Sequence, residues 1–234
     1  MKRVYSAAGD RIVSHDPLIV RRYGPFTRAN HWLTAVSMLV LVLTGFAFFY
    51  PSLFFLTGLF GGGQIARWLH PIAGLVMAAS FLILFVQLVR LNLPRREDVE
   101  WSMQIGDLLS GNENVMPPLG KYNAGQKLVF WGMAGLLAVM LVTGIMIWEE
   151  MVPLWQDRFP TLAGIPARRI AVALHALSAV LMMLLLILHV YAAIWTRGTF
   201  SAMLNGTVTG GWAYQHHRKW LRELAGRQGE GKPE

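Results

Sequence analysis

The 234 residues are 54% hydrophobic, include no cysteine and carry a formal net charge of +8. The lack of cysteine excludes disulfides, thiolate nucleophiles, iron–sulfur ligation and covalent haem attachment within this chain. Because the basic residues flank long apolar blocks, we expect them to meet membrane lipid headgroups or cofactor carboxylates, and we expect no nucleic acid.

Four uncharged apolar blocks are each long enough to cross a bilayer. They cover about residues 32–50, 68–89, 128–148 and 170–195, and each has a tryptophan at one or both ends, which is typical of membrane interfaces. The sequence therefore predicts an all-α fold, an integral membrane four-helix bundle over residues 31–197. Residues 1–30 are predicted to be a polar N-terminal extension, and residues 198–234 a C-terminal tail.

The basic residues are distributed unevenly between the two sides of the predicted bundle. The N-terminal segment, the 90–127 connection and the tail hold 17 of the 21 lysines and arginines. Since cytoplasmic loops carry the excess of positive charge, both termini are predicted to be cytoplasmic in a bacterial inner membrane.

Four histidines lie in or at the mouth of the apolar blocks: His31, His70, His175 and His189. On one helix, the last two would lie about 21 Å apart along the axis and about 40° apart around it. Imidazoles on one stripe at two membrane depths suit two flat ligands stacked across the membrane, and haem fits that description. The alternative for each histidine is a core residue hydrogen-bonded to a neighbouring helix.

Membrane depth predicts how these histidines pair. His31 should open the first helix at the inner face, where His189 also lies, whereas His70 and His175 lie near the outer starts of their helices. We therefore predict that the His31–His189 pair holds an inner haem b and that the His70–His175 pair holds an outer haem b, each histidine being an axial ligand of iron. Pro71 is expected in the first turn of its helix, where a missing N–H costs little.

Four arginines precede these histidines in the chain: Arg28, Arg67, Arg168 and Arg169. A guanidinium pairs well with a carboxylate, so they are candidate partners of the haem propionates. The alternative is that they extend to lipid headgroups.

The stretch KYNAGQK at 121–127 places polar groups at the inner start of the third helix. Asn123 and Gln126 have the spacing of a reciprocal helix cap. With the flexible Gly125, the same amides could instead donate hydrogen bonds to a quinone at the depth of the inner haem. Both interpretations stay open from these residues alone.

Several long motifs occur in a fixed order along residues 25–225: RANHW around His31, FFYPSLFFLTGLFGGG at 48–63, RWLHP around His70, GKYNAGQK ending at Lys127, and HVYAAIWTRGTFSAMLNGTVTGGWAYQHHRKW from His189 to Trp220. With these motifs the chain resembles the gamma subunit of membrane-bound respiratory formate dehydrogenase. The polar residues before 25 depart from that family.

The resemblance implies a dihaem cytochrome b subunit that passes electrons from an iron–sulfur beta subunit across the membrane to quinone, either menaquinone or ubiquinone. Formate oxidation would belong to a molybdenum- or tungsten-containing alpha subunit, and the heterotrimer could assemble further. The resemblance also implies the same haem ligands, and a quinone site at Asn123, Gly125 and Gln126 next to His189.

Two alternatives remain. The first is the cytochrome b subunit of a nickel–iron hydrogenase or a thiosulfate-reductase-type complex, which would share the haems but receive electrons from another donor. The second is a non-haem membrane anchor or metal transporter, although the lack of acidic residues in all four apolar blocks counts against cation transport.

Overall fold

The computed structural model describes residues 5–112 and 115–229. By its contacts the chain divides into two compact units. The helical unit comprises Asn30–Leu84 and Gly132–Ile187, and the terminal unit comprises Met1–Ala29, Phe85–Trp131 and Leu188–Glu234.

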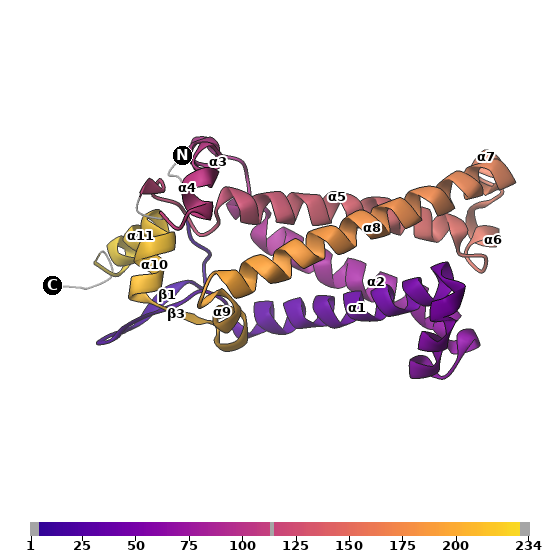
Figure 1. Ribbon diagram of the computed structural model, residues 1–234, viewed down its shortest axis with the longest axis horizontal. Coiled ribbons are helices and arrows are strands. Elements are labelled where there is room, and N and C mark those ends of the chain that lie inside the picture. Colours follow the sequence, from indigo (N-terminus) through magenta and orange to yellow (C-terminus); the bar gives the residue numbers. More distant parts are fainter. Residues whose placement is uncertain (1–4, 113–114, 230–234) are drawn as a thin grey trace. The chain divides into compact units, whose positions relative to one another are not determined.

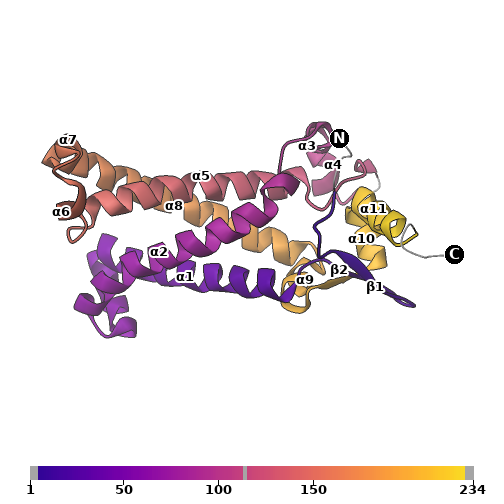
Figure 2. The ribbon, with the colours of Figure 1, turned by 180° about the vertical axis from the view of Figure 1, so that it is seen from behind.

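Four long helices form the frame of the helical unit, where Figures 1 and 2 show them side by side. They are α1 (Pro25–Phe49), α2 (Gly63–Leu88), α5 (Ala124–Ile147) and α8 (Ile165–Trp195). Each is long and apolar enough to cross a membrane, which confirms the predicted membrane-spanning bundle.

Each long helix begins four to seven residues before its predicted apolar block, because helical hydrogen bonding continues into the polar flank. His31 was expected to open the first helix, and this is wrong: α1 starts at Pro25, so His31 is its seventh residue. The expectation for Pro71 is also wrong, since it is the ninth residue of α2. Having no N–H, Pro71 leaves the Arg67 carbonyl without its usual donor inside the helix.

The core of the helical unit contains three buried methionines, Met38 of α1, Met77 of α2 and Met182 of α8, with apolar side chains of α5 packed around them. Methionine is flexible enough to fill irregular gaps between helices. Polar contacts add to this packing: the Asn30 amide donates to the Ser80 carbonyl at 2.9 Å, and Ser80 Oγ donates back to Asn30 Oδ1 at 2.9 Å. These bonds join α1 to α2.

Short helices connect the long ones within the helical unit. They are η1 (Pro51–Phe60) between α1 and α2, and α6 (Val152–Trp155) and α7 (Pro160–Ala163) between α5 and α8. Each carries proline at its first or second position, where the preset φ favours helix and no N–H is needed.

The terminal unit contains a small antiparallel sheet of β1 (Arg11–His15), β2 (Leu18–Arg21) and β3 (Thr207–Thr209), in the order β1-β2-β3. Its helices are η2 (Val89–Leu91), α3 (Arg96–Met103), α4 (Ile105–Leu109), α9 (Thr199–Asn205), α10 (Gly210–His216) and α11 (Arg218–Gly229). The all-α fold predicted from the sequence did not include these strands. Because Val20 pairs with Val208, the predicted N-terminal extension and C-terminal tail share one sheet.

Candidate functional site

Two of the predicted haem ligands come together in the helical unit. The ring centroids of His70 on α2 and His175 on α8 lie 6.4 Å apart, and the ring planes are turned by 61°. A metal–imidazole bond is about 2 Å and the ring centroid lies about 1.1 Å behind the nitrogen, so two rings on opposite sides of one metal have centroids about 6.2 Å apart. The separation of these rings therefore fits a shared metal ion such as a haem iron.

A buried threonine contacts each of these rings from the preceding long helix. Thr44 Oγ1 of α1 lies 2.7 Å from His70 Nδ1, and Thr143 Oγ1 of α5 lies 3.0 Å from His175 Nδ1. The exposed fractions of the two threonines are 0% and 4%. Both histidines are thus held at Nδ1, which leaves Nε2 as the nitrogen that could bind a metal.

A glycine follows each threonine and packs against the same ring. A Cβ atom on Gly45 would lie 3.6 Å from His70 Cε1, and one on Gly144 would lie 3.4 Å from His175 Cε1. These contacts were not predicted from the sequence. The signal that could have revealed them is the Thr-Gly pair that occurs within the first and third apolar blocks.

The other two predicted ligands belong to different units. His31 lies in the helical unit, with its ring 5.8 Å from that of Trp32, whereas His189 lies in the terminal unit, near the end of α8. The pairing of His31 with His189 therefore stays a prediction.

Two of the candidate propionate partners lie at the start of α8. Arg168 and Arg169 line a surface hollow together with Glu149, which lies 3.6 Å from the Arg168 guanidinium. Arg168 is seven residues before His175, about two helical turns, so both lie on one face of α8. Arg67 is exposed, three residues before its histidine.

Arg28 makes a contact within the terminal unit. Its Nη1 donates to the backbone carbonyl of Leu204, at the end of α9. This bond uses one of the five guanidinium donors. A role for Arg28 toward a propionate stays a prediction.

Asn123 and Gln126 form the reciprocal cap that their spacing indicated. The Gln126 backbone N–H donates to Asn123 Oδ1 at 2.8 Å, and the Asn123 backbone N–H donates to Gln126 Oε1 at 3.1 Å. Since a backbone N–H needs an oxygen acceptor, the cap uses the carbonyl oxygens of both side chains and leaves both NH₂ groups free to donate elsewhere. The same two residues can therefore cap the helix and bind a carbonyl ligand.

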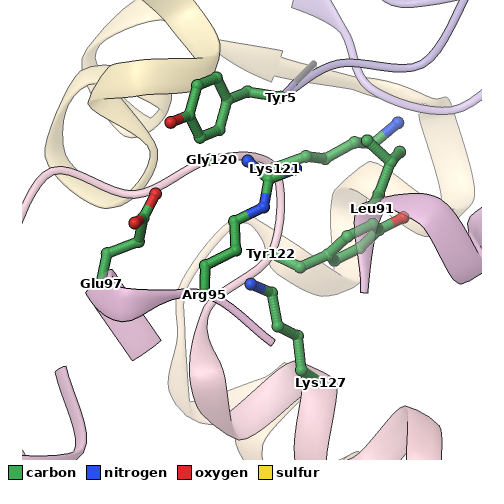
Figure 3. Close-up of a pocket in the computed structure, with 8 residues that line it drawn as sticks. All are labelled: Tyr5, Leu91, Arg95, Glu97, Gly120, Lys121, Tyr122 and Lys127. Carbon is green, nitrogen blue, oxygen red and sulfur yellow. The ribbon is translucent and has the colours of Figure 1, made fainter. Parts of the chain in front are cut away.

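The third member of the predicted quinone site packs against an aromatic ring: a Cβ on Gly125 would lie 3.2 Å from Trp101. The neighbours of the cap, Lys121, Tyr122 and Lys127, line a small polar pocket (Figure 3). Lys127 Nζ also donates to Asp98 Oδ2 at 2.7 Å in a largely buried pair. The start of α5 is thus a polar, partly buried surface.

Comparison with known proteins identifies the family. The model of the prokaryotic cytochrome b561 family matches residues 22–206. This chain is a member of the prokaryotic cytochrome b561 family. A cytochrome b carries haem b, so the predicted type of cofactor is confirmed, while the number of haems stays a prediction.

Three relatives are similar to this chain over most of their length. The nitrate-inducible formate dehydrogenase cytochrome b556(Fdn) subunit of Escherichia coli K12 is 36% identical over 197 residues, which are 84% of this chain and 88% of that protein. The formate dehydrogenase cytochrome b556(fdo) subunit of the same strain is 39% identical over 203 residues, 87% and 92% of the two chains. The formate dehydrogenase cytochrome b556 subunit of Haemophilus influenzae is 36% identical over 211 residues, 90% and 85%.

Proposed function

We propose that this cytochrome is the dihaem membrane subunit of a formate dehydrogenase complex and that it passes electrons to quinone. Three relatives with 36–39% identity are named as formate dehydrogenase cytochrome subunits. The observation that carries the proposal is the 6.4 Å separation of the His70 and His175 rings, which suits two histidines that would both bind one haem iron.

The chain's own residues would hold the outer haem in three ways. His70 and His175 would bind the iron through Nε2, Gly45 and Gly144 would pack against the rings, and Arg168 with its neighbour Arg169 would offer cations to the propionates. When bound, haem b supplies a one-electron redox centre within the membrane.

The inner site would be held by His31 and His189. On α8, fourteen residues separate His175 from His189, about 21 Å along the axis. That spacing would put two haem sites at different membrane depths, so that electrons would cross most of the bilayer within this one subunit.

Quinone would bind at the start of α5. The free NH₂ groups of Asn123 and Gln126 can donate to a quinone carbonyl. Gly125 has no side chain and so allows the start of α5 to pack closely against Trp101. Lys127, the residue after Gln126 on α5, forms a largely buried ion pair with Asp98 of α3 beside this proposed quinone site.

The proposed partners are an iron–sulfur subunit as electron donor and a molybdenum- or tungsten-containing subunit that oxidises formate. The proposed location is the bacterial inner membrane, with both termini in the cytoplasm. Electrons moving inward across the membrane would then contribute to the membrane potential, worth about 2.3 kcal/mol per charge per 100 mV.

The decisive experiment is to purify the tagged chain from membranes with its partners, quantify haem by the pyridine haemochrome assay and identify the co-purifying subunits. We expect two haems b per chain, a formate-oxidising partner, and haems that formate reduces and a quinone analogue reoxidises. A hydrogenase as partner would replace the proposed donor while keeping the haem scheme. A pure protein without a haem spectrum would overturn the proposal in favour of a membrane anchor.

A further inference from the structure

The hydroxyl groups of Thr44 and Thr143 each contact one histidine nitrogen and one backbone carbonyl of their own helix. Besides the contacts with the histidines, each hydroxyl lies 2.7 Å from the carbonyl four residues earlier in its own helix, Val40 O for Thr44 and Val139 O for Thr143. Two oxygens at this distance require a proton between them. The only proton of each hydroxyl is therefore directed at a helix carbonyl.

The direction of the hydroxyl proton determines which ring nitrogen of each histidine carries a hydrogen. Thr44 Oγ1 lies 2.7 Å from His70 Nδ1, and because its own proton is already used, it can only accept at that contact. Nδ1 must then carry the hydrogen. The same argument applies to His175 beside Thr143, at 3.0 Å. In a neutral imidazole with Nδ1 protonated, Nε2 carries the lone pair that can bind a metal.

We propose that Thr44 and Thr143 are positioning residues that hold His70 and His175 in the tautomer with Nδ1 protonated and aim Nε2 of both at a single haem iron. The inference rests on the proposed function, in which these histidines would hold the outer haem. It adds the two hydroxyl groups that decide which nitrogen of each ring is available.

The same arrangement of threonine and histidine occurs twice in the helical unit. In each copy a threonine on one helix contacts a histidine on the next long helix, and a core methionine follows that histidine by seven residues, as Met77 follows His70 and Met182 follows His175. Seven residues are about two turns, so each methionine lies on the same face as its histidine. Two independent occurrences of one arrangement argue against a chance contact.

The hydroxyls should also adjust the redox equilibrium. An acceptor at Nδ1–H makes the imidazole a stronger donor to the metal. A stronger donor favours ferric over ferrous iron, because the ferric state carries the extra positive charge. Thr44 and Thr143 should therefore lower the reduction potential of the outer haem relative to ligands without such acceptors.

The test replaces each threonine by valine, which keeps the shape and removes the hydroxyl, and by serine, which keeps the hydroxyl. The assembled complex in isolated membranes is titrated by potential while haem spectra and electron paramagnetic resonance signals are recorded. In Thr44→Val and Thr143→Val we expect the ferric-to-ferrous equilibrium of the outer haem to shift toward ferrous by about tenfold, which is about 59 mV for one electron. We expect the serine variants to match wild type and the inner haem to stay unchanged.

Thr57→Val is the matched control. Thr57 is also a buried threonine of the helical unit, and its hydroxyl donates to the Phe54 carbonyl at 2.8 Å. We expect wild-type potentials for this variant. If a valine variant loses the outer haem, recovery of the haem in the matching serine variant supports the proposal.

Two results would overturn the inference. One is a set of valine variants that keep both haems with wild-type potentials and signals. The other is loss of haem in both the valine and the serine variants, since the hydroxyl would then not be the deciding group. Failure of the proposed function is distinguishable, because wild-type membranes would then lack the outer haem before any threonine is changed.

Discussion

Asp10 and Lys121 lie 111 positions apart in the chain and form a buried ion pair, with Oδ1 and Nζ 2.6 Å apart. Lys121 Nζ also donates to the Arg22 carbonyl at 2.7 Å, and Trp220 Nε1 donates to Asp10 Oδ2 at 2.9 Å. The pair therefore connects the N-terminal segment, the connection before α5 and the C-terminal segment within the terminal unit.

Breaking this pair should destabilise the terminal unit. Asp10→Asn leaves the Lys121 ammonium buried without its counter-charge, and we expect a loss of about 3–5 kcal/mol. Earlier thermal unfolding and faster proteolysis of the terminal unit would report it. Glu149→Gln is the control, because its partner Arg168 is 3.6 Å away and its own side chain is 83% exposed, so about 1 kcal/mol or less is expected. Equal effects of the two changes would contradict the importance of burial.

The variants Asn123→Asp and Gln126→Glu separate a quinone donor from a helix cap. Each keeps the oxygen that accepts the backbone N–H and loses the NH₂ group. We expect stability within about 1 kcal/mol of wild type and reoxidation of the haems by quinone slowed about tenfold for each lost hydrogen bond. Stopped-flow spectroscopy of formate-reduced membranes measures this rate. Wild-type rates in both variants would place the quinone elsewhere.

Removing one histidine at a time should remove one haem at a time. His70→Ala should abolish the outer haem and His31→Ala the inner one, because the two belong to different predicted pairs. Since haem binds only the folded state, each variant should also unfold at a lower temperature. Pyridine haemochrome assays and low-temperature spectra give the count and identity. Loss of the same haem in both variants would refute the pairing.

The terminal unit should lose stability in mild acid because of His217. The His217 side chain is 1% exposed, and its Nδ1 lies 2.7 Å from the Gly120 carbonyl. Burial, together with the nearby Arg22 guanidinium, lowers the pKa of His217 well below its ordinary value. Below about pH 6.5 the unfolded chain binds a proton there that the folded chain does not, so stability falls as the pH decreases. His217→Gln should flatten that part of the stability profile, measured by denaturant unfolding between pH 7.5 and 5, about the histidine range. An unchanged profile would assign the acid sensitivity to other groups.

Reporter fusions test the proposed orientation. A reporter after Arg197 should be active in the cytoplasm, and one within residues 152–160 should be active outside, because the basic residues are concentrated on the side of the termini. The reverse pattern would reverse the direction of charge movement and leave the histidine pairs intact.

The sequence alone was sufficient for the four membrane-spanning helices, because a span is defined by uncharged length and this can be counted along the chain. The rise of about 1.5 Å per helical residue also predicts the membrane depths of the histidines, and these depths stay a prediction. The cap of Asn123 and Gln126 was also predictable, because both partners lie within one turn. The starts of the helices were predicted less accurately. Pro71 was expected in the first turn of α2, but the helix begins at Gly63, before the apolar block.

Only the tertiary structure decided which distant residues meet. The contact of Thr44 with His70 depends on how α1 and α2 are rotated against each other, and many rotations satisfy the same apolar composition. The pairing of Val20 with Val208 and the ion pair of Asp10 with Lys121 join segments that no local periodicity relates. Such contacts depend on the simultaneous packing of several elements. For this physical reason the sequence pattern indicates candidate ligands but not the threonines that contact them.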